Sequence, residues 1–371
     1  MRKIISVCLA VIISLSLISC GNKGGTATSD FVNNTGVNPM YDQLNEDGKK
    51  AYDRIVADVA DGKTEYVFKN VDVDTVTKGY LAVVADHPEF FWINEGYSCS
   101  TKTLGNEVTI TFTSKCNITA GEIEGKNSAL NSVVGEIVSQ AEALSDDYSK
   151  IKFVHDYIVN ATVYDEESFR IMVGGSTDQP LDATTAYGCL VNKKAVCSGY
   201  AAAFQLCMQR LGVSCGRIAG HKIGGESHEW NYLLLGDEYY FIDVTWDDPV
   251  LEDKSKSALT YEYFLIDEAE LLLTHTINPD QTYPACNGKS QNYYKVNGLF
   301  LETYSFDSVK NIILEKGLTD GIEIKFASEQ ERQKAIKELF EESKIFEIPG
   351  FENGVSYSLG SSGLVLSVFA K

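Results

Sequence analysis

Residues 195–212 read AVCSGYAAAFQLCMQRLG. Apolar residues recur in this segment at helical spacing, among them Phe204 and Leu211, and Gly212 is a natural helix terminator. The pattern therefore predicts a helix that begins close to Cys197. Exposed backbone N–H groups and the helix dipole favour an anion at such a position, so they favour the thiolate of Cys197. Cys197 is our candidate nucleophile.

Three strand-like runs follow this predicted helix. They are VSCGRIAG at 213–220, SHEWNYLLL at 227–235 and EYYFIDVTW at 238–246. Strict alternation of side chains in such runs is typical of strands. One helix followed by an antiparallel meander predicts an α+β core.

A cysteine nucleophile needs a base and a group that orients the base. His228 begins the second run, and the Gly236-Asp237 pair between the second and third runs predicts a tight two-residue turn. If this turn sets the pairing, Asp243 lies diagonal to His228 on the same face, about 7 to 8 Å away and within reach of longer side chains. A slip of one residue would place the two on opposite faces.

These segments carry a resemblance to a known family. AVCSGYAAAF, SHEWNYLLL and YYFIDVTWDDP resemble the Cys, His and Asp motifs of the transglutaminase-like superfamily, in the same order and with similar spacing. DYSKIKFVHDYIVNATVYD at 147–165 and AYGCLVNKK at 186–194 are similar to segments that lead into this core in bacterial members. Those members include relatives of the eukaryotic cytokinesis-associated transglutaminase-like proteins. The resemblance covers about residues 145–250.

The resemblance implies a papain-like fold, in which the helix of Cys197 packs against the antiparallel sheet. It implies that Cys197 is the nucleophile, His228 the general base and acid, and Asp243 the residue that orients and stabilises the imidazolium. The oxyanion hole would use the backbone N–H of Cys197 and a side chain upstream, for which Tyr187 is the candidate. We expect no cofactor.

The remaining cysteines and histidines have simpler interpretations. Cys207 and Cys215 lie in a predicted helix and strand, where a buried cysteine is usually inert. His155 is predicted to be structural or to lie on a helix surface. A zinc site of His221, His228 and Glu226 lacks the spacing of the HExxH motif, so no metal is predicted. Cys99 and Cys116 flank a predicted hairpin at Gly105-Asn106, but that turn would pair Cys99 with Phe112, so a disulfide between the two cysteines has no support.

The N-terminus has the pattern of an export signal. Residues 1–19 carry two basic residues and then a short apolar run, too short for the roughly 20 residues of a membrane-spanning helix. The run ends in Leu17-Ile18-Ser19-Cys20, which resembles the lipobox of bacterial lipoproteins. That resemblance implies cleavage before Cys20, a lipid on its sulfur and a location on the outer side of the cell membrane. An ordinary signal peptide that happens to contain Cys20 is the alternative.

The rest of the chain divides by composition and periodicity. We predict a signal peptide at 1–19, the lipidated Cys20 with a flexible spacer at 20–38, and an N-terminal helical region with a β-hairpin at 39–144. A catalytic domain at 145–290 and a small α/β domain at 291–371 follow. In the helical region, amphipathic helices are expected at 40–61, 73–85 and 120–144. In the last domain, helices are expected at 306–316 and 329–342.

Composition excludes several classes of protein. The 371 residues are 44% hydrophobic and 23% charged, which is typical of a folded protein rather than a disordered one. A formal net charge of −20, with no clustered basic residues, argues against nucleic acid as a partner. The membrane is expected to be a partner only through the N-terminal lipid.

The sequence therefore predicts a surface lipoprotein that acts on amide or peptide bonds through a thioester. Water as the acceptor would make it a thiol protease or amidase, and an amine would make it a transamidase. Peptides or proteins, including cell-wall peptides, are the expected substrates. The alternatives are a non-catalytic extracellular binding or scaffold module that retains the fold, and a purely structural envelope protein.

Overall fold

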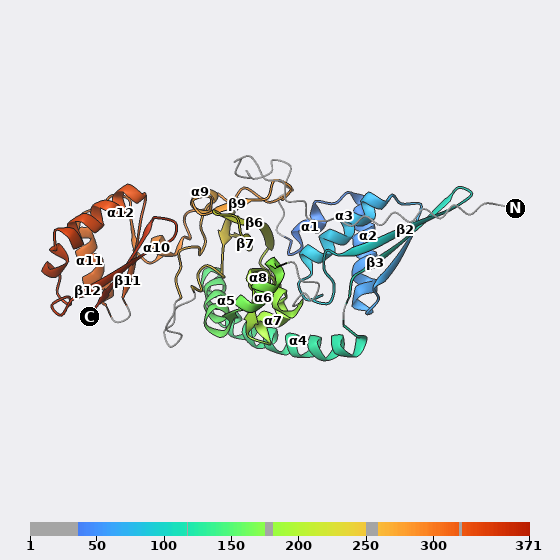
Figure 1. Cartoon of the computed structure of the whole chain (residues 1–371), viewed down its shortest axis with the longest axis horizontal. Coiled ribbons are helices and arrows are strands. Elements are labelled where there is room, and N and C mark those ends of the chain that lie inside the picture. Colours follow the sequence, from blue (N-terminus) through green and yellow to red (C-terminus); the bar gives the residue numbers. More distant parts are fainter. Residues whose placement is uncertain (1–35, 117, 175–180, 250–258, 319–320) are drawn as a thin grey trace.

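The computed structural model describes residues 36–116, 118–174, 181–249, 259–318 and 321–371. The predicted signal peptide, Cys20 and most of the spacer lie outside these residues. Figure 1 shows the N-terminal elements at one end, the C-terminal elements at the other, and the helix of Cys197 with its sheet between them. No helix in the described part of the chain is both long enough and apolar enough to cross a bilayer.

The first elements form a small α+β unit with its own apolar core. They are α1 (Pro39–Asp42), α2 (Glu46–Ala60), β1 (Glu65–Lys69), α3 (Val73–Asp86), β2 (Tyr97–Leu104) and β3 (Glu107–Ser114). The strands are ordered β1-β3-β2, and Cys99 lies opposite Phe112 as the turn at Gly105 predicts. The predicted helix at 40–61 is instead two helices, because the Asn45 side chain accepts a hydrogen bond from Gly48 N and caps α2.

A long helix leads from this unit into the central core. In α4 (Ala120–Glu142), Thr119 and Glu122 form a capping box at the start of the helix. One face of α4, including Leu130 and Ile137, is buried in the same apolar cluster as α5 (Asp147–Ala161). The predicted boundary between domains at 144/145 thus falls between two helices that share one core.

The central unit is built around a four-stranded sheet. Helices α6 (Glu166–Val173), α7 (Ala186–Leu190) and α8 (Cys197–Arg210) lie on one side of it, and α9 (Glu268–Leu271) lies on the other. Its sheet has the order β8-β7-β6-β9, formed by β6 (Cys215–Lys222), β7 (Ser227–Leu235), β8 (Glu238–Ile242) and β9 (His275–Ile277). A short parallel pair, β4 (Val163–Tyr164) and β5 (Lys194–Ala195), precedes α8. Asn231 donates a hydrogen bond from β7 to the carbonyl of Ala201 at 3.0 Å, which ties the sheet to α8.

The register of β7 and β8 is the one that the turn predicts. Leu235 pairs with Glu238 across the turn, and Gly236 adopts φ +63°. The ladder ends at Asn231 and Ile242, however, so the predicted strand at 238–246 is four residues too long. The chain turns here because the Asp243 carboxylate accepts hydrogen bonds from the backbone N–H groups of residues 245 and 246, which a continuing ladder could not provide.

The C-terminal elements form a third apolar core. They are α10 (Tyr293–Val296), β10 (Phe300–Leu301), α11 (Phe306–Lys316), β11 (Ile322–Phe326), α12 (Glu329–Ile336), β12 (Val355–Leu359) and β13 (Val365–Ala370). The sheet order is β10-β11-β13-β12, with β10 parallel to β11 and the other pairs antiparallel. The predicted helix at 329–342 ends earlier as an α-helix, and one π-helical turn at Lys337–Glu341 follows it.

Polar contacts join this third unit to the central one. Lys325, with a side chain only 1% exposed, pairs with Glu270 at 2.6 Å. The Glu262 carboxylate accepts hydrogen bonds from the backbone N–H groups of Ser361 and Ser362 at 2.9 and 2.8 Å. Because these buried charged groups have partners across the boundary, the contacts fix the position of one unit relative to the other.

Candidate active site

Cys197 is the first residue of α8. The residue before it, Val196, is extended and has no side chain that could cap the helix. Val196 is held in place by the hydrogen bond from its N–H to the carbonyl of Ala183 at 2.9 Å. Backbone N–H groups at a helix start have no partner within the helix, so the N–H of Cys197 is suited to bind developing negative charge.

A glycine allows the chain to approach this helix start closely. A Cβ added to Gly199 would lie 2.5 Å from the carbonyl oxygen of Ala183 and 2.8 Å from the Cβ of Ala195. Both distances are shorter than side chains tolerate. Gly199 therefore lets the turn Leu181–Thr184 pack directly against the first turn of α8.

The structure brings together the three residues that the sequence predicts. Nε2 of His228 lies 2.6 Å from Oδ2 of Asp243, and both side chains are buried. Cys197 lies near enough to this pair to raise the pKa of the His228 imidazole. A thiol, an imidazole and a carboxylate are thus gathered at one place, as a cysteine nucleophile and its base require.

The surroundings of His228 favour the charged form of its imidazole. Burial lowers the pKa of His228, but the charge and hydrogen bond of Asp243, together with Cys197, raise it to about 10. Burial raises the pKa of Asp243, and the two imidazoles next to it more than offset this, so the pKa lies well below the usual range. Asp243 is therefore a carboxylate, and His228 is an imidazolium at neutral pH.

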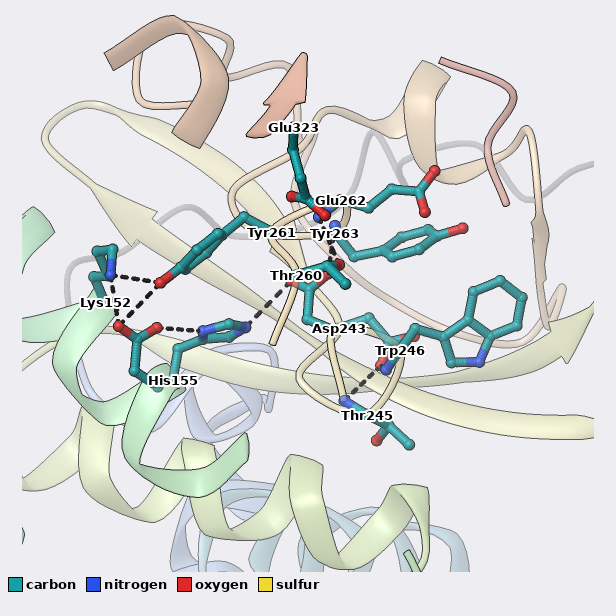
Figure 2. Close-up of polar contacts among 12 residues, drawn as sticks. Lys152, His155, Asp243, Thr245, Trp246, Thr260, Tyr261, Glu262, Tyr263 and Glu323 are labelled. Carbon is teal, nitrogen blue, oxygen red and sulfur yellow. Dashed lines mark hydrogen bonds and ion pairs between the residues drawn. The ribbon is translucent and has the colours of Figure 1, made fainter. Parts of the chain in front are cut away.

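The carboxylate of Asp243 accepts four hydrogen bonds. Oδ1 receives the backbone N–H groups of Thr245 and Trp246, both at 3.1 Å, as Figure 2 shows. Oδ2 receives His228 and also His275, whose Nε2 lies 3.2 Å away. The sequence analysis did not single out His275. The only signal for it is the short alternation THTI at 274–277, which is too brief to identify a strand.

His228, Asp243 and His275 also have the composition of a metal site, since one donor atom from each lies within 4.8 Å of the others. The distance of 2.6 Å between His228 Nε2 and Asp243 Oδ2 is that of a hydrogen bond. Two ligands of one tetrahedral zinc ion, each bound at about 2.0 to 2.2 Å, would lie roughly 3.4 Å apart. We therefore interpret this group as a hydrogen-bonded network.

A second buried network supports the loop after Asp243. The imidazole of His155 lies between two carboxylates, with Nδ1 at 3.0 Å from Asp156 Oδ1 and Nε2 at 3.2 Å from Asp247 Oδ2. Figure 2 shows how Lys152 and Tyr261 extend this network on the other side of Asp156. His155 is fully buried, so the prediction that it could lie on a helix surface is wrong.

The pKa values of both His155 and Asp247 are raised in this network. Burial lowers the pKa of His155, but Asp156 and Asp247 raise it above its ordinary value. Burial raises the pKa of Asp247 to about 6, with only partial compensation from His155. Asp247 also accepts a hydrogen bond from the backbone N–H of Tyr263 at 2.9 Å. The network thereby fixes the segment that begins at Asp243.

Two tyrosines are candidates for the oxyanion site. Tyr187 lies on α7, with its ring 5.5 Å from that of Phe91 and with the Lys126 ammonium 4.8 Å above it. Tyr164 lies on β4 opposite Ala195, two residues before Cys197. Burial and then the negative charge of Cys197 raise the pKa of Tyr164. The sequence analysis did not identify Tyr164.

Three other buried cysteines are poor nucleophiles. The seven cysteines in the described part of the chain are free thiols. Burial raises the pKa of both Cys189 and Cys207 to about 12, and that of Cys215 further still. Thiols of this kind are almost entirely protonated at neutral pH.

Comparisons with known proteins give limited matches. No protein-family model matches the sequence. The chain is 25% identical over 160 residues to the kyphoscoliosis peptidase of Mus musculus, a match that covers 40% of this chain and 22% of that protein. It is 24% identical over 175 residues to the kyphoscoliosis peptidase of Homo sapiens, covering 43% of this chain and 25% of that protein. The chain therefore spans a quarter or less of the length of these relatives.

Two solved structures are also similar in part. A TGase aligns with a TM-score of 0.32 at 16% identity, covering 46% of this chain and 50% of the TGase. A candidate cysteine protease from Cytophaga hutchinsonii aligns with a TM-score of 0.26 at 11% identity, covering 49% of this chain and 64% of that protein. We therefore infer function from the geometry of the site.

Proposed function

We propose that the chain is a cysteine-dependent enzyme that acts on amide or peptide bonds through a thioester. The observation that carries this proposal is the buried imidazole of His228, which is hydrogen-bonded to Asp243 at 2.6 Å and has its pKa raised by both Asp243 and Cys197. The name of the two kyphoscoliosis peptidases supports a peptide or protein substrate.

The first half of the reaction forms the thioester. The Cys197 thiolate attacks the carbonyl carbon, and the oxyanion binds the N–H of Cys197 and the hydroxyl of Tyr164 or Tyr187. The imidazolium of His228 then gives its proton to the leaving nitrogen, so the C–N bond breaks and the amine departs. Asp243 keeps the ring oriented throughout.

The second half releases the acyl group. Water or a second amine attacks the thioester and gives a proton to the now neutral imidazole of His228. The C–S bond breaks, and the thiolate–imidazolium pair is restored. Water makes the enzyme a protease or amidase, and an amine makes it a transamidase.

A non-catalytic binding or scaffold module is the alternative function. The intact set of Cys197, His228 and Asp243 argues against it, because a site without chemistry has no need for a cysteine beside a buried imidazole–carboxylate pair.

The test of the enzyme is activity profiling with peptide libraries that contain glutamine and cell-wall peptides, with Cys197→Ala as the control. Iodoacetamide at neutral pH should alkylate Cys197 faster than Cys207 or Cys215. Equal alkylation of the three thiols, or unchanged activity of Cys197→Ala, would exclude the enzyme.

We also propose that the chain is a surface lipoprotein, anchored through Cys20 outside the cytoplasm of a bacterial cell. The proposed order is signal peptide 1–19, spacer 20–38, helical region 39–144, catalytic domain 145–290 and α/β domain 291–371. Cell-wall peptides or extracellular proteins would then be within reach of the site. Metabolic labelling with a clickable palmitate should mark the wild-type chain and not Cys20→Ala. Equal labelling of the two would exclude the anchor.

A further inference from the structure

His275 is a fully buried histidine that the proposed reaction does not use. It begins β9, at the edge of the central sheet, where its backbone lies opposite Lys222 of β6. Its ring centroid lies 4.4 Å from that of Trp246 and 5.0 Å from that of Trp230. Aromatic rings on two sides therefore restrict how the imidazole can turn.

The hydrogen bond from His275 to Asp243 has only one consistent direction. A carboxylate can only accept, so Nε2 of His275 donates to Asp243 Oδ2 at 3.2 Å. Nδ1 lies 2.8 Å from the hydroxyl of Thr274, whose single proton can go to Nδ1 or to the carbonyl oxygen of Leu271 at 3.4 Å; we take the shorter contact as the one it makes. The hydroxyl of Tyr263 in turn donates to Thr274 Oγ1 at 3.2 Å. The chain Tyr263–Thr274–His275 thus presents an N–H to Asp243.

This N–H completes the coordination of the carboxylate. Oδ1 is held by two backbone N–H groups, and Oδ2 is shared between His228 at 2.6 Å and His275 at 3.2 Å. An ionised carboxylate has about four acceptor positions, so all are occupied. Without His275, one position of Oδ2 is empty and the carboxylate can turn away from His228.

We propose that His275 is a positioning residue, which locks Asp243 in the orientation that serves His228. The proposal rests on the function proposed above for Cys197 and His228. His275 touches no reacting atom in this scheme and acts through Asp243. Replacing it should lower kcat and leave KM unchanged, because substrate binding does not involve Asp243.

The pH dependence follows from the groups around the carboxylate. The ionisable groups that interact electrostatically with Asp243 come from several elements: His228, His275, Asp247, Tyr164 and Tyr263, and Cys197 acts on the same imidazole of His228. Of these groups, His228 and His275 donate hydrogen bonds to Asp243 and so favour its ionised form. Removing a hydrogen bond to a charged group favours its neutral form. Loss of His275 should therefore move the acidic limb of the pH–kcat profile to higher pH.

The first experiment reads the proton positions without any substrate. The chain has five histidines, so selective ¹⁵N-histidine labelling gives five imidazoles to assign by NMR with single His→Gln variants. We expect His275 to be protonated at Nε2 and bare at Nδ1. The opposite tautomer would overturn the proposal whether or not the protein is an enzyme.

The second experiment uses His275→Ala, His275→Gln and Thr274→Val. His275→Ala should lose on the order of tenfold in kcat, as expected for a hydrogen bond to a charged group, and shift the acidic limb. His275→Gln keeps an N–H near the position of Nε2 and should recover most of both effects. Thr274→Val is nearly isosteric, removes the hydroxyl partner of Nδ1, and should change kcat and the acidic limb in the same direction as His275→Ala.

The outcomes separate this proposal from the proposed function. If His275→Ala and Thr274→Val keep the wild-type kcat and acidic limb, His275 has no positioning role and the enzyme proposal is unaffected. If wild type has no measurable activity, the pH profile of iodoacetamide alkylation at Cys197 replaces kcat. A shift of that profile in Thr274→Val, in protein shown to be folded by circular dichroism, supports the proposal, and an unchanged profile overturns it.

Discussion

The imidazole Nε2 of His228 lies 2.6 Å from Oδ2 of Asp243, although the β7–β8 ladder ends before it reaches either residue. The contact is therefore made by side chains beyond the paired part of the hairpin. Asp243 can reach His228 because its other oxygen binds the backbone of the turn that follows. The hydrogen bonds from the turn to Asp243 Oδ1 therefore both end β8 and orient the carboxylate toward His228.

The first prediction concerns Asp243→Asn. In wild type the pKa of His228 is raised to about 10, so the imidazolium that protonates the leaving amine persists up to that pH. Without the carboxylate charge, the largest influence that raises this pKa is lost while burial still lowers it, so the pKa should fall. The alkaline limb of the kcat/KM profile should therefore move to lower pH. Activity at pH 7.5 should fall by a factor of about 10² to 10⁴.

The control for this variant is Asp280→Asn, which neutralises an exposed carboxylate a few residues beyond β9. It should keep the wild-type pH profile. An alkaline limb that stays near pH 10 in Asp243→Asn would show that Asp243 does not hold the proton on His228.

The second prediction separates the two tyrosines. Tyr164 pairs with Ala195, two residues before Cys197, and the charge of Cys197 raises its pKa, whereas the ring of Tyr187 packs against Phe91 and Lys126. Tyr164→Phe should therefore lower kcat by about 10² at constant KM, the usual effect of losing one oxyanion donor. Tyr187→Phe should change kcat by less. The reverse order in steady-state kinetics would assign the oxyanion site to Tyr187.

The sequence predicts best where a local signal sets the geometry. The Gly236-Asp237 turn fixes the register of β7 and β8, and His228 and Asp243 meet just beyond the end of this ladder. The helix of Cys197 is likewise predicted from its spacing and from Gly212. Both features depend on residues close together in the chain.

The missed features depend on distant residues. His275 is 32 residues from Asp243 and lies in a strand of three residues, which gives no periodicity to detect. The contact of His155 with Asp247 spans 92 residues. The end of β8 was also missed, because the alternation in FIDVTW favours a strand, and only the side-chain bonds of Asp243 terminate it.

The third prediction concerns stability and pH. His155→Leu should leave Asp247 buried without its partner and lower the free energy of unfolding by about 3 to 5 kcal/mol at pH 6. The pKa of His155 is raised in the folded state, so its contribution is full below about pH 6.5 and is lost as the pH rises through the folded value. The difference between wild type and variant should shrink from pH 6 to pH 9.

Urea unfolding at several pH values measures this difference. The matched control is His221→Leu, since His221 lies half-buried on β6 and is not part of the network. That control should show a small difference from wild type. A His155→Leu difference that is the same at every pH would mean that His155 is neutral in the fold.

The fourth prediction concerns the backbone around Cys197. An alanine at Gly199 would place its Cβ 2.5 Å from the Ala183 carbonyl oxygen, so backbone has to move. Overpacking of this kind costs about 1 to 3 kcal/mol. Because the strain falls on the first turn of α8, Gly199→Ala should also slow alkylation of Cys197.

Gly135→Ala is the control, since the added Cβ in α4 would meet nothing within 4 Å. This variant should stabilise the protein by about 0.5 to 1 kcal/mol. Stabilisation by both variants would mean that the turn at Ala183 yields easily, and that the close approach does not hold Cys197 in place.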